Sequence, residues 1–295
     1  MIGSAAALSL PLQAARPKGY LVENATHMFS EDQVHFPFHP KGTNKPRPST
    51  VENYSNFVRE TKLDHTVIVQ SEVYQDDHRY LEYCFEHEPS PGYFKGTCLF
   101  DPIDPKTPAR IDELVRRLKG RIVGIRIHTL NAPGTPPATD GPMRNRDLQS
   151  VGMKNTWRKM HDLGLMVQMQ TIPHHAPRIG ALAGQFRDML VIIDHLALPA
   201  RGTAAEYEDV INLSKLPRVY MKVSSLTDKD KPLVRRLYDA YGPDRLIWGG
   251  YGSSVPAFER AIALSEFVFD YATEEERMKI RGLNAMKLYR FPTSL

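Results

Sequence analysis

Side chains that can transfer protons stand at intervals along this chain, each at or just after the end of a short apolar run. They are His27, Glu72, His128, His195 and Tyr251. A histidine exchanges protons near neutral pH, and a carboxylate can act as a base when it is turned into a pocket. A tyrosine hydroxyl is better suited to donating a hydrogen bond or a proton, because its free pKa is about 10. These residue types indicate general acid–base chemistry.

An arginine with a different chemistry lies close to one of these residues. Arg126 precedes His128 by two positions, so both side chains point to the same side of a strand. A guanidinium there can bind a substrate carboxylate through two parallel hydrogen bonds. Structural alternatives are an internal ion pair for Arg126, a backbone-bonded buried ring for His128 and a solvated loop carboxylate for Glu72. Tyr74, near Glu72, is expected to line the same site.

Eight short β-rich runs position these residues. The runs cover residues 19–24, 65–70, 93–100, 122–128, 165–170, 189–195, 218–224 and 245–250. Most are continuously apolar, as expected of parallel strands buried on both faces, and helical spacing between them occurs at 107–120, 155–165, 229–242 and 255–272. This alternation predicts an α/β fold with a single (β/α)8 TIM barrel. The alternative is an open doubly wound sheet, but no glycine-rich phosphate turn follows any strand.

The carboxyl ends of the strands of a TIM barrel meet at one face, where active sites form. The residues expected to share this mouth are Glu23, Ala25, His27, Gln70, Glu72, Arg126, His128, Gln168, Gln170, His195, Lys222, Ser224, Trp248 and Tyr251. This set is rich in histidine and poor in carboxylates. Two segments rich in proline and glycine, 35–50 and 129–147, follow strands and are expected to be loops that shape the mouth, the alternative being disordered surface excursions.

The length of 295 residues suits one barrel, and a hydrophobic content of 41% is enough for one large core. We predict a flexible N-terminal segment at residues 1–18 and a TIM-barrel catalytic domain at 19–295. The first fifteen residues resemble the end of an export signal but lack its basic start. This segment is either the remnant of a trimmed leader or a loose tail. The first alternative would place the protein in the periplasm and the second in the cytoplasm.

Charge and cysteine content exclude several classes of partner. The formal net charge of +4 is spread along the chain, which gives no case for nucleic acid binding. No apolar stretch is long enough to cross a bilayer. The two cysteines, Cys84 and Cys98, form neither a disulfide framework nor a zinc motif. The expected partner is a small-molecule substrate, and a homo-oligomer stays open.

Four motifs make the chain resemble a known family. They are VIIDHLALP (191–199), VYMKVSSL (219–226), DRLIWGG (244–250) and LNAMKLY (283–289). In this order they resemble the amidohydrolase-2 branch of the amidohydrolase superfamily, in particular lactone hydrolases of the 2-pyrone-4,6-dicarboxylate lactonase type. The resemblance implies a distorted TIM barrel that hydrolyses a lactone or a related carbonyl compound. It also implies a site built from an Asp-x-His-x-His motif on the first strand, a His on the sixth and an Asp on the eighth.

The match to this family site is incomplete. In ENATH, His27 is kept, whereas Glu23 replaces the Asp and Ala25 replaces the first His. His195 is kept in IIDH, and WGGYGS puts Tyr251 where the general-base Asp belongs. A catalytic metal needs three or more protein ligands, so we expect no tightly bound metal and no cofactor. Some lactonases of this branch are understood to work without a metal, with histidines that polarise the carbonyl.

The leading prediction is a metal-independent hydrolase of a lactone or related cyclic ester that carries a carboxylate or other polar groups. The catalytic residues are expected to be His27, His195, Tyr251, His128 and Glu72, and the substrate-binding residues Glu23, Arg126, Tyr74, Gln170 and Trp248. A lyase, such as a decarboxylase or an eliminating enzyme, is the alternative, because a pocket of this kind can move protons without activating water. A third hypothesis is a catalytically inactive or engineered member that acts as a binding protein.

Overall fold

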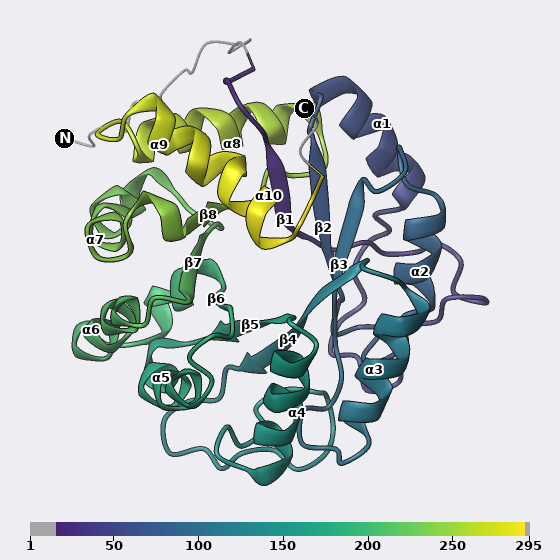
Figure 1. Ribbon diagram of the computed structural model, residues 1–295. Coiled ribbons are helices and arrows are strands. Elements are labelled where there is room, and N and C mark those ends of the chain that lie inside the picture. Colours follow the sequence, from purple (N-terminus) through teal and green to yellow (C-terminus); the bar gives the residue numbers. More distant parts are fainter. Residues whose placement is uncertain (1–15, 293–295) are drawn as a thin grey trace, which may run out of the picture.

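Eight parallel strands form the centre of the molecule in the computed structural model, which describes residues 16–292 (Figure 1). They are β1 (Val22–Thr26), β2 (His65–Val69), β3 (Phe94–Cys98), β4 (Ile122–Thr129), β5 (Met166–Thr171), β6 (Val191–Ile193), β7 (Val219–Val223) and β8 (Leu246–Trp248). Each strand pairs in parallel with the next one along the chain. The predicted (β/α)8 barrel is confirmed, and each predicted run overlaps one strand.

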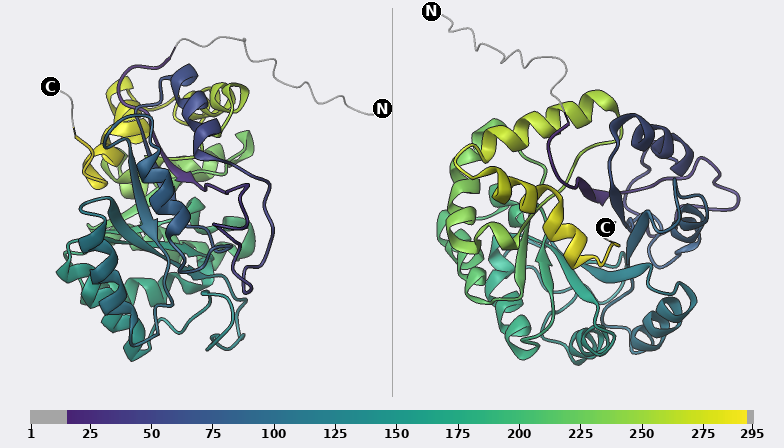
Figure 2. Two further views of the ribbon diagram at one scale, coloured as in Figure 1. Left: turned by 90° about the vertical axis from the view of Figure 1, so that its right-hand side faces the viewer. Right: turned by 45° about the horizontal axis from the view of Figure 1, so that its top comes forward.

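Helices follow the strands and form the outer layer (Figures 1 and 2). They are α1 (Val51–Thr61), α2 (Arg79–Glu86), α3 (Thr107–Arg117), α4 (Val151–Asp162), α5 (Ala176–Gln185), α6 (Ala204–Asn212), α7 (Lys231–Tyr241) and α8 (Val255–Val268), with the short α9 (Glu274–Met278) and α10 (Asn284–Leu288) at the end. Local chemistry sets their starts: Thr50 and Ser150 accept hydrogen bonds from the first turns of α1 and α4. Each predicted helical stretch overlaps α3, α4, α7 or α8.

The amino-terminal end of the barrel is closed by α10. Apolar side chains from the starts of the strands, including Val22 and Met166, pack there against Met286 and Tyr289. In Figures 1 and 2 this helix lies across one end of the barrel. A larger apolar layer fills the space between the strands and the outer helices. This helix thus covers the starts of the strands.

The seam between β1 and β8 is held by side chains, because no backbone ladder joins these two strands within residues 16–292. The Asn24 amide donates to the main-chain oxygen of Trp248. A Cβ on Gly249 would lie 2.7 Å from the Asn24 Oδ1 atom, so this close approach requires glycine. The barrel is therefore irregular at one seam.

Two long loops surround the carboxyl end of the barrel, as predicted for 35–50 and 129–147. The first, between β1 and α1, is tied to itself where Phe29 and Ser49 pair. The second, between β4 and α4, is held by Asn145, whose main-chain N–H donates to the His128 oxygen at 2.7 Å. Its Oδ1 atom accepts from the Leu130 N–H at 2.6 Å. These bonds give the loops fixed positions around the mouth.

Three further predictions concern the N-terminal segment, membrane spans and the two cysteines. Most of the predicted segment 1–18 lies outside the described residues. No helix in the described part of the chain has the length and apolarity needed to span a membrane. Cys84 and Cys98 are buried free thiols.

Candidate active site

A buried ion network crosses the barrel interior. Arg126 on β4 donates its Nε–H to Oδ2 of Asp194, which follows β6, at 3.0 Å. Lys222 on β7 places its Nζ 3.0 Å from the other oxygen, Oδ1, and donates to the main-chain oxygen of Asn24 at 2.6 Å. Gln168 on β5 donates to Oδ2 of Asp194 at 2.9 Å. Because two of these contacts, from Arg126 to Asp194 and from Lys222 to Asn24, join strands that are not neighbours, the side chains point into the barrel.

This network carries more positive than negative charge. Two cations, Arg126 and Lys222, share the single carboxylate of Asp194, and all three side chains are buried. Burial raises the pKa of Asp194, but Lys222 and Arg126 lower it further, so it stays well below its usual range. Burial lowers the pKa of Lys222, and Asp194 opposes that effect. Lys222 also interacts with the buried carboxyl of Glu23, so within this network it is the guanidinium of Arg126 that favours an anionic ligand.

Two histidines flank the guanidinium of Arg126. The His27 Nδ1 atom is 2.7 Å from the main-chain oxygen of Val69, and its Nε2 is 3.5 Å from Nη1 of Arg126. The His195 Nδ1 is 2.8 Å from Oγ of Ser224, and its Nε2 is 3.4 Å from Nη2 of Arg126. A guanidinium only donates, so this geometry assigns the lone pair of each ring to Nε2. Each imidazole thus turns an acceptor toward the arginine.

Both of these histidines are neutral at physiological pH. Burial, followed by the charge of Arg126, lowers the pKa of His27 to about 3. Burial lowers the pKa of His195 to about 4, although Asp194 acts in the opposite direction. Neutral imidazoles retain one acceptor and one donor each. Here both acceptors face Arg126, so the two rings orient the guanidinium without adding charge.

The backbone that carries His195 is strained. Four consecutive residues, 195–198, have φ between 49° and 59°, a conformation that non-glycine residues rarely adopt. Hydrogen bonds hold this turn: the Ala197 N–H donates to the Asp194 oxygen at 2.9 Å, and the Tyr207 hydroxyl donates to the Leu196 oxygen at 2.9 Å. Such strain persists where the surroundings enforce it, which is common at functional sites. Here it places Asp194 and His195 side by side in the mouth.

His128 is the histidine with free ring nitrogens. It is 2% exposed, and neither Nδ1 nor Nε2 has a hydrogen-bond partner among residues 16–292. Burial and the charge of Arg126 lower its pKa well below the ordinary value. Gln170 is its register partner on β5. A buried imidazole without partners is costly, so this ring is suited to a ligand or a water molecule, and the backbone-bonded alternative does not apply.

The structure does not bring two further predicted residues into this cluster. Glu72 follows β2, and its Oε1 lies 3.7 Å from the Arg144 Nε atom, across the mouth loops. Tyr74 is buried, and its hydroxyl oxygen accepts the Ser30 N–H at 2.8 Å while its ring packs on Phe38. Tyr74 therefore supports the first loop, and the prediction that it binds substrate is corrected.

Glu23 has a structural role at the barrel seam, which corrects its prediction as a substrate-binding residue. Its carboxylate accepts the N–H groups of Ala25 at 2.6 Å and of Gly250 at 3.0 Å, and it also accepts that of Tyr251. Burial raises the pKa of Glu23, and these backbone donors oppose the rise. The carboxylate of Glu23 therefore holds the backbone after β8 in place through the N–H groups of Gly250 and Tyr251.

The expected orientations of Trp248 and Tyr251 are wrong. In β8 it is Ile247 that points into the barrel core, so the neighbouring Trp248 points outward and packs on Phe269. After the strand, Gly250 has a φ of 88°, which turns the backbone. The Tyr251 side chain is fully buried, and its hydroxyl donates to the main-chain oxygen of Arg281 at 2.9 Å. Tyr251 therefore faces the C-terminal helices and not the mouth.

The sequence pattern predicts no role for four polar residues of this site. Lys222, Ser224 and Gln168 lie at strand ends, and Asp194 is the neighbour of His195. Alternation along the strands would have found them, because Gln168, Arg126 and Lys222 occupy inward positions on three strands. Their pairing could not be read from the sequence.

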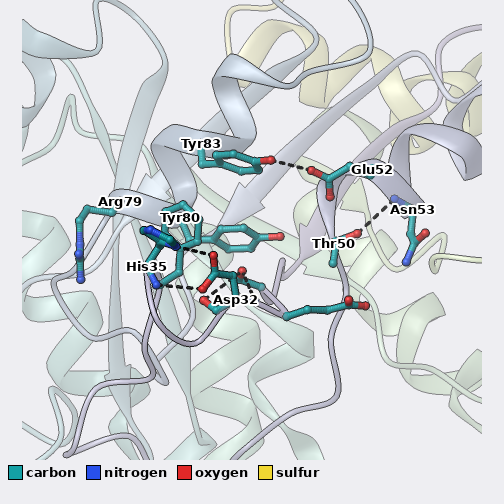
Figure 3. Close-up of a pocket in the computed structure, with 11 residues that line it drawn as sticks. Asp32, His35, Thr50, Glu52, Asn53, Arg79, Tyr80 and Tyr83 are labelled. Carbon is teal, nitrogen blue, oxygen red and sulfur yellow. Dashed lines mark hydrogen bonds and ion pairs between the residues drawn. The ribbon is translucent and has the colours of Figure 1, made fainter.

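A groove of about 770 Å³ lies on the flank of the barrel between the first loop, α1 and α2 (Figure 3). Its lining includes the carboxylates of Glu31, Asp32 and Glu52 beside the rings of Tyr80 and Tyr83. The Tyr83 hydroxyl donates to Oε1 of Glu52 at 2.9 Å. None of the mouth histidines lines this groove, so it is separate from the site in the barrel.

The residues of the mouth do not fit a metal ion. Among residues 16–292, no three His, Cys, Asp or Glu side chains are grouped so that they could hold one. The Nε2 atoms of His27 and His195 face the Arg126 guanidinium, and the free ring of His128 by itself supplies too few ligands for a catalytic metal. A second cation at that place would meet the positive charge of the arginine. Ala25 supplies no ligand atom, and Tyr251 faces away.

Comparisons with known proteins agree with this architecture. A family model described as amidohydrolase matches residues 25–291, and the chain therefore belongs to the amidohydrolase family. A search of curated proteins found no match.

Solved structures share the fold at low identity. A probable 2-pyrone-4,6-dicarboxylic acid hydrolase from Acinetobacter baumannii, with citric acid bound, has 20% identity and a TM-score of 0.71, covering 92% of this chain and 99% of that one. An amidohydrolase from Burkholderia multivorans with bound zinc has 16% identity and a TM-score of 0.71, covering 93% and 100%. A dihydroxybenzoic acid decarboxylase from Polaromonas sp. JS666 with bound manganese has 11% identity and a TM-score of 0.66, covering 94% and 98%. The fold thus occurs in hydrolases and decarboxylases alike.

Proposed function

We propose that this protein is a metal-independent hydrolase of a lactone or related cyclic ester that carries a carboxylate. The observation that carries the proposal is the Arg126 guanidinium, buried in the barrel mouth between the neutral rings of His27 and His195. The buried guanidinium of Arg126 supports an anionic substrate. The citric acid in the similar Acinetobacter baumannii protein, a polycarboxylate, is consistent with such a ligand.

Arg126 acts on the carbonyl group in this mechanism. Its Nε–H is engaged by Asp194, and one N–H of each terminal nitrogen faces a histidine, which leaves two N–H groups for a substrate. A carbonyl oxygen that receives these hydrogen bonds becomes negative as water attacks the carbon. A fixed cation in a buried site stabilises that charge strongly, because no water must reorganise around it.

His128 accepts the proton of the attacking water. Both of its ring nitrogens are free, and its ring is close enough to Arg126 for the two to interact electrostatically. Negative charge that forms on the substrate next to Arg126 raises the pKa of His128 during the attack, which makes the ring a better base. The bond between the carbonyl carbon and the ring oxygen then breaks, and the leaving oxygen takes the proton that His128 received from the water. The product is an open-chain hydroxy acid or its keto tautomer.

A lyase is the second candidate function. The decarboxylase from Polaromonas sp. JS666 shares the fold, and a free imidazole such as His128 could protonate a carbanion as well as accept a proton from water. An inactive barrel that binds its ligand without turnover is the third.

One experiment separates these candidates. The purified protein is incubated with a panel of carboxylated lactones and phenolic acids in water enriched in oxygen-18, and products are analysed by mass spectrometry. Hydrolysis places the heavy oxygen in a new carboxylate of the product, whereas decarboxylation releases carbon dioxide and leaves the remaining organic product without heavy oxygen. We expect His128→Asn to lower kcat by about 100-fold or more, while the exposed control His161→Asn leaves it unchanged. Release of carbon dioxide together with an organic product that lacks oxygen-18 would show that the protein is a lyase and not a hydrolase.

A further inference from the structure

Two arginines of the loop between β4 and α4 have opposite surroundings. Arg146 is buried, and its guanidinium donates to both carboxylate oxygens of Asp101, at 3.0 and 2.7 Å, and to the main-chain oxygen of Asp140. The Arg144 side chain is 38% exposed, and within residues 16–292 its guanidinium donates no hydrogen bond. Arg146 therefore holds the loop together, whereas the N–H groups of the Arg144 guanidinium are available to a ligand.

Among residues 16–292, Arg144 has one ion-pair partner, Glu72. The Oε1 atom of Glu72 lies 3.7 Å from the Arg144 Nε atom, beyond hydrogen-bond distance. The Glu72 side chain is only 17% exposed, and Oε1 itself is buried without a hydrogen bond in the described part of the chain. Well-formed pairs of arginine and carboxylate make short parallel hydrogen bonds. This pair has the charge attraction without those bonds.

Arg144 is held close to the reacting groups. Its neighbour Asn145 takes a left-handed conformation with a φ of 59° and bonds to the His128 main chain. The charge of Arg144 reaches the His128 ring, where it adds to the larger effects of burial and Arg126. A carboxylate bound by Arg144 would thus lie in the same mouth as Arg126.

We propose that Glu72 is an internal stand-in for a substrate carboxylate: it occupies Arg144 in the free protein and releases it when the substrate supplies a carboxylate of its own. This inference rests on the proposed function, since it assumes that a carboxylated ring enters the mouth. The incoming carboxylate can form the two short bonds that Glu72 does not form. The ligand class is then a cyclic ester whose carboxylate lies away from the carbonyl that reacts at Arg126.

The test uses isophthalate, an unreactive planar ring with two carboxylates, in calorimetric titrations at pH 7.5. We expect Arg144→Gln to weaken its binding by about 10-fold or more, because a charge-assisted pair is lost. Glu72→Gln should instead strengthen binding by about 3-fold or more, because the competing carboxylate is gone. When Glu72→Gln is combined with Arg144→Gln, the gain in affinity from Glu72→Gln should disappear. The matched controls are Arg116→Gln and Asp112→Asn, from an ion pair on α3, and neither should change the affinity.

Each other outcome overturns the inference. Weaker or unchanged binding by Glu72→Gln would show that this carboxylate does not compete. A gain that persists in the double variant would show a general charge effect and no exchange at Arg144. Absence of binding by both the natural protein and Glu72→Gln would exclude Arg144 as a carboxylate site. The titrations need no turnover, so they can support the role of Arg144 even if no lactone in the panel is hydrolysed. If a lactone is hydrolysed but the titrations fail, the hydrolase proposal holds and the exchange at Arg144 is wrong.

Discussion

Replacement of Asp194 by asparagine tests the ion network on which the whole site depends. The change keeps the size of the side chain but removes the carboxylate that lies 3.0 Å from Nε of Arg126 and 3.0 Å from Nζ of Lys222. Removing one partner of a buried ion pair costs about 3–5 kcal/mol, because the other charge is left buried without compensation. Here two cations lose their shared partner, so we expect a loss in the upper half of that range.

The expected loss can be measured as a melting temperature. Unfolding entropy is about 2.1 cal/mol/K per residue, or roughly 0.6 kcal/mol/K for a chain of this length. A loss of about 4–5 kcal/mol therefore lowers the Tm by roughly 6–8 °C. Asp239→Asn is the matched control, because Asp239 pairs with Arg235 on the surface of α7 and should contribute less than about 1 kcal/mol. Urea unfolding at pH 7.5 gives the same comparison as a free energy.

A double variant shows whether the charge is the cause. Lys222→Met should cost less in the Asp194→Asn background than in the natural protein, because there it removes an unpaired cation instead of breaking a pair. The reasoning fails if Asp194→Asn lowers the free energy of unfolding by less than about 1 kcal/mol. It also fails if the two changes are simply additive.

Two further predictions follow from the positions of other side chains. Tyr251→Phe removes the hydrogen bond to the Arg281 oxygen, so it should lower the free energy of unfolding by about 0.5–1.5 kcal/mol. It should leave kcat within about twofold. A roughly 100-fold loss of kcat would show that Tyr251 acts in catalysis after all. The pKa values of His27 and His195 fall from 6.5 to about 3 and about 4 on folding, so the unfolded chain binds more protons below neutral pH and stability should fall from pH 7 to pH 4. Urea unfolding at these pH values should show a flatter fall in His27→Gln, and an equal fall would contradict the assignment.

The part of the site that lies within strands could be predicted from the sequence. The apolar runs fixed where the strands would lie, and the alternation of side chains along a strand placed Arg126 and His128 on the same inward face. His27 and His195 follow the ends of β1 and β6, and the resemblance to a family site drew attention to them. All four residues meet in the mouth of the barrel.

The rest of the site depends on features that a sequence pattern does not contain. Tyr251 follows two glycines, and the positive φ of Gly250 decides where its side chain points. Glu23 turns to backbone N–H groups that become its neighbours only when β1 and β8 meet. Glu72 faces Arg144 because two loops far apart in the chain meet over the mouth. In each case a contact across the closed barrel, and not the local pattern, sets the role.

Arg126 also decides whether the mouth can hold a metal ion. A zinc ion binds imidazole nitrogen at about 2.0–2.1 Å, and here the guanidinium faces both Nε2 atoms, at 3.5 and 3.4 Å. We expect the natural protein, after exposure to Zn²⁺ and desalting, to retain far less than one equivalent by mass spectrometry, and chelators to leave turnover unchanged.

Arg126→Met removes the cation and keeps an apolar side chain in its place, so it should release the two histidines as ligands and raise zinc affinity by about 10-fold or more. Arg116→Met, an exposed change on α3, should leave zinc binding as it is. If the natural protein bound one equivalent of zinc and lost it in His27→Gln, the guanidinium would have to move aside for the metal. The electrophile would then be the ion, and Arg126 would return to the role of a substrate-binding residue.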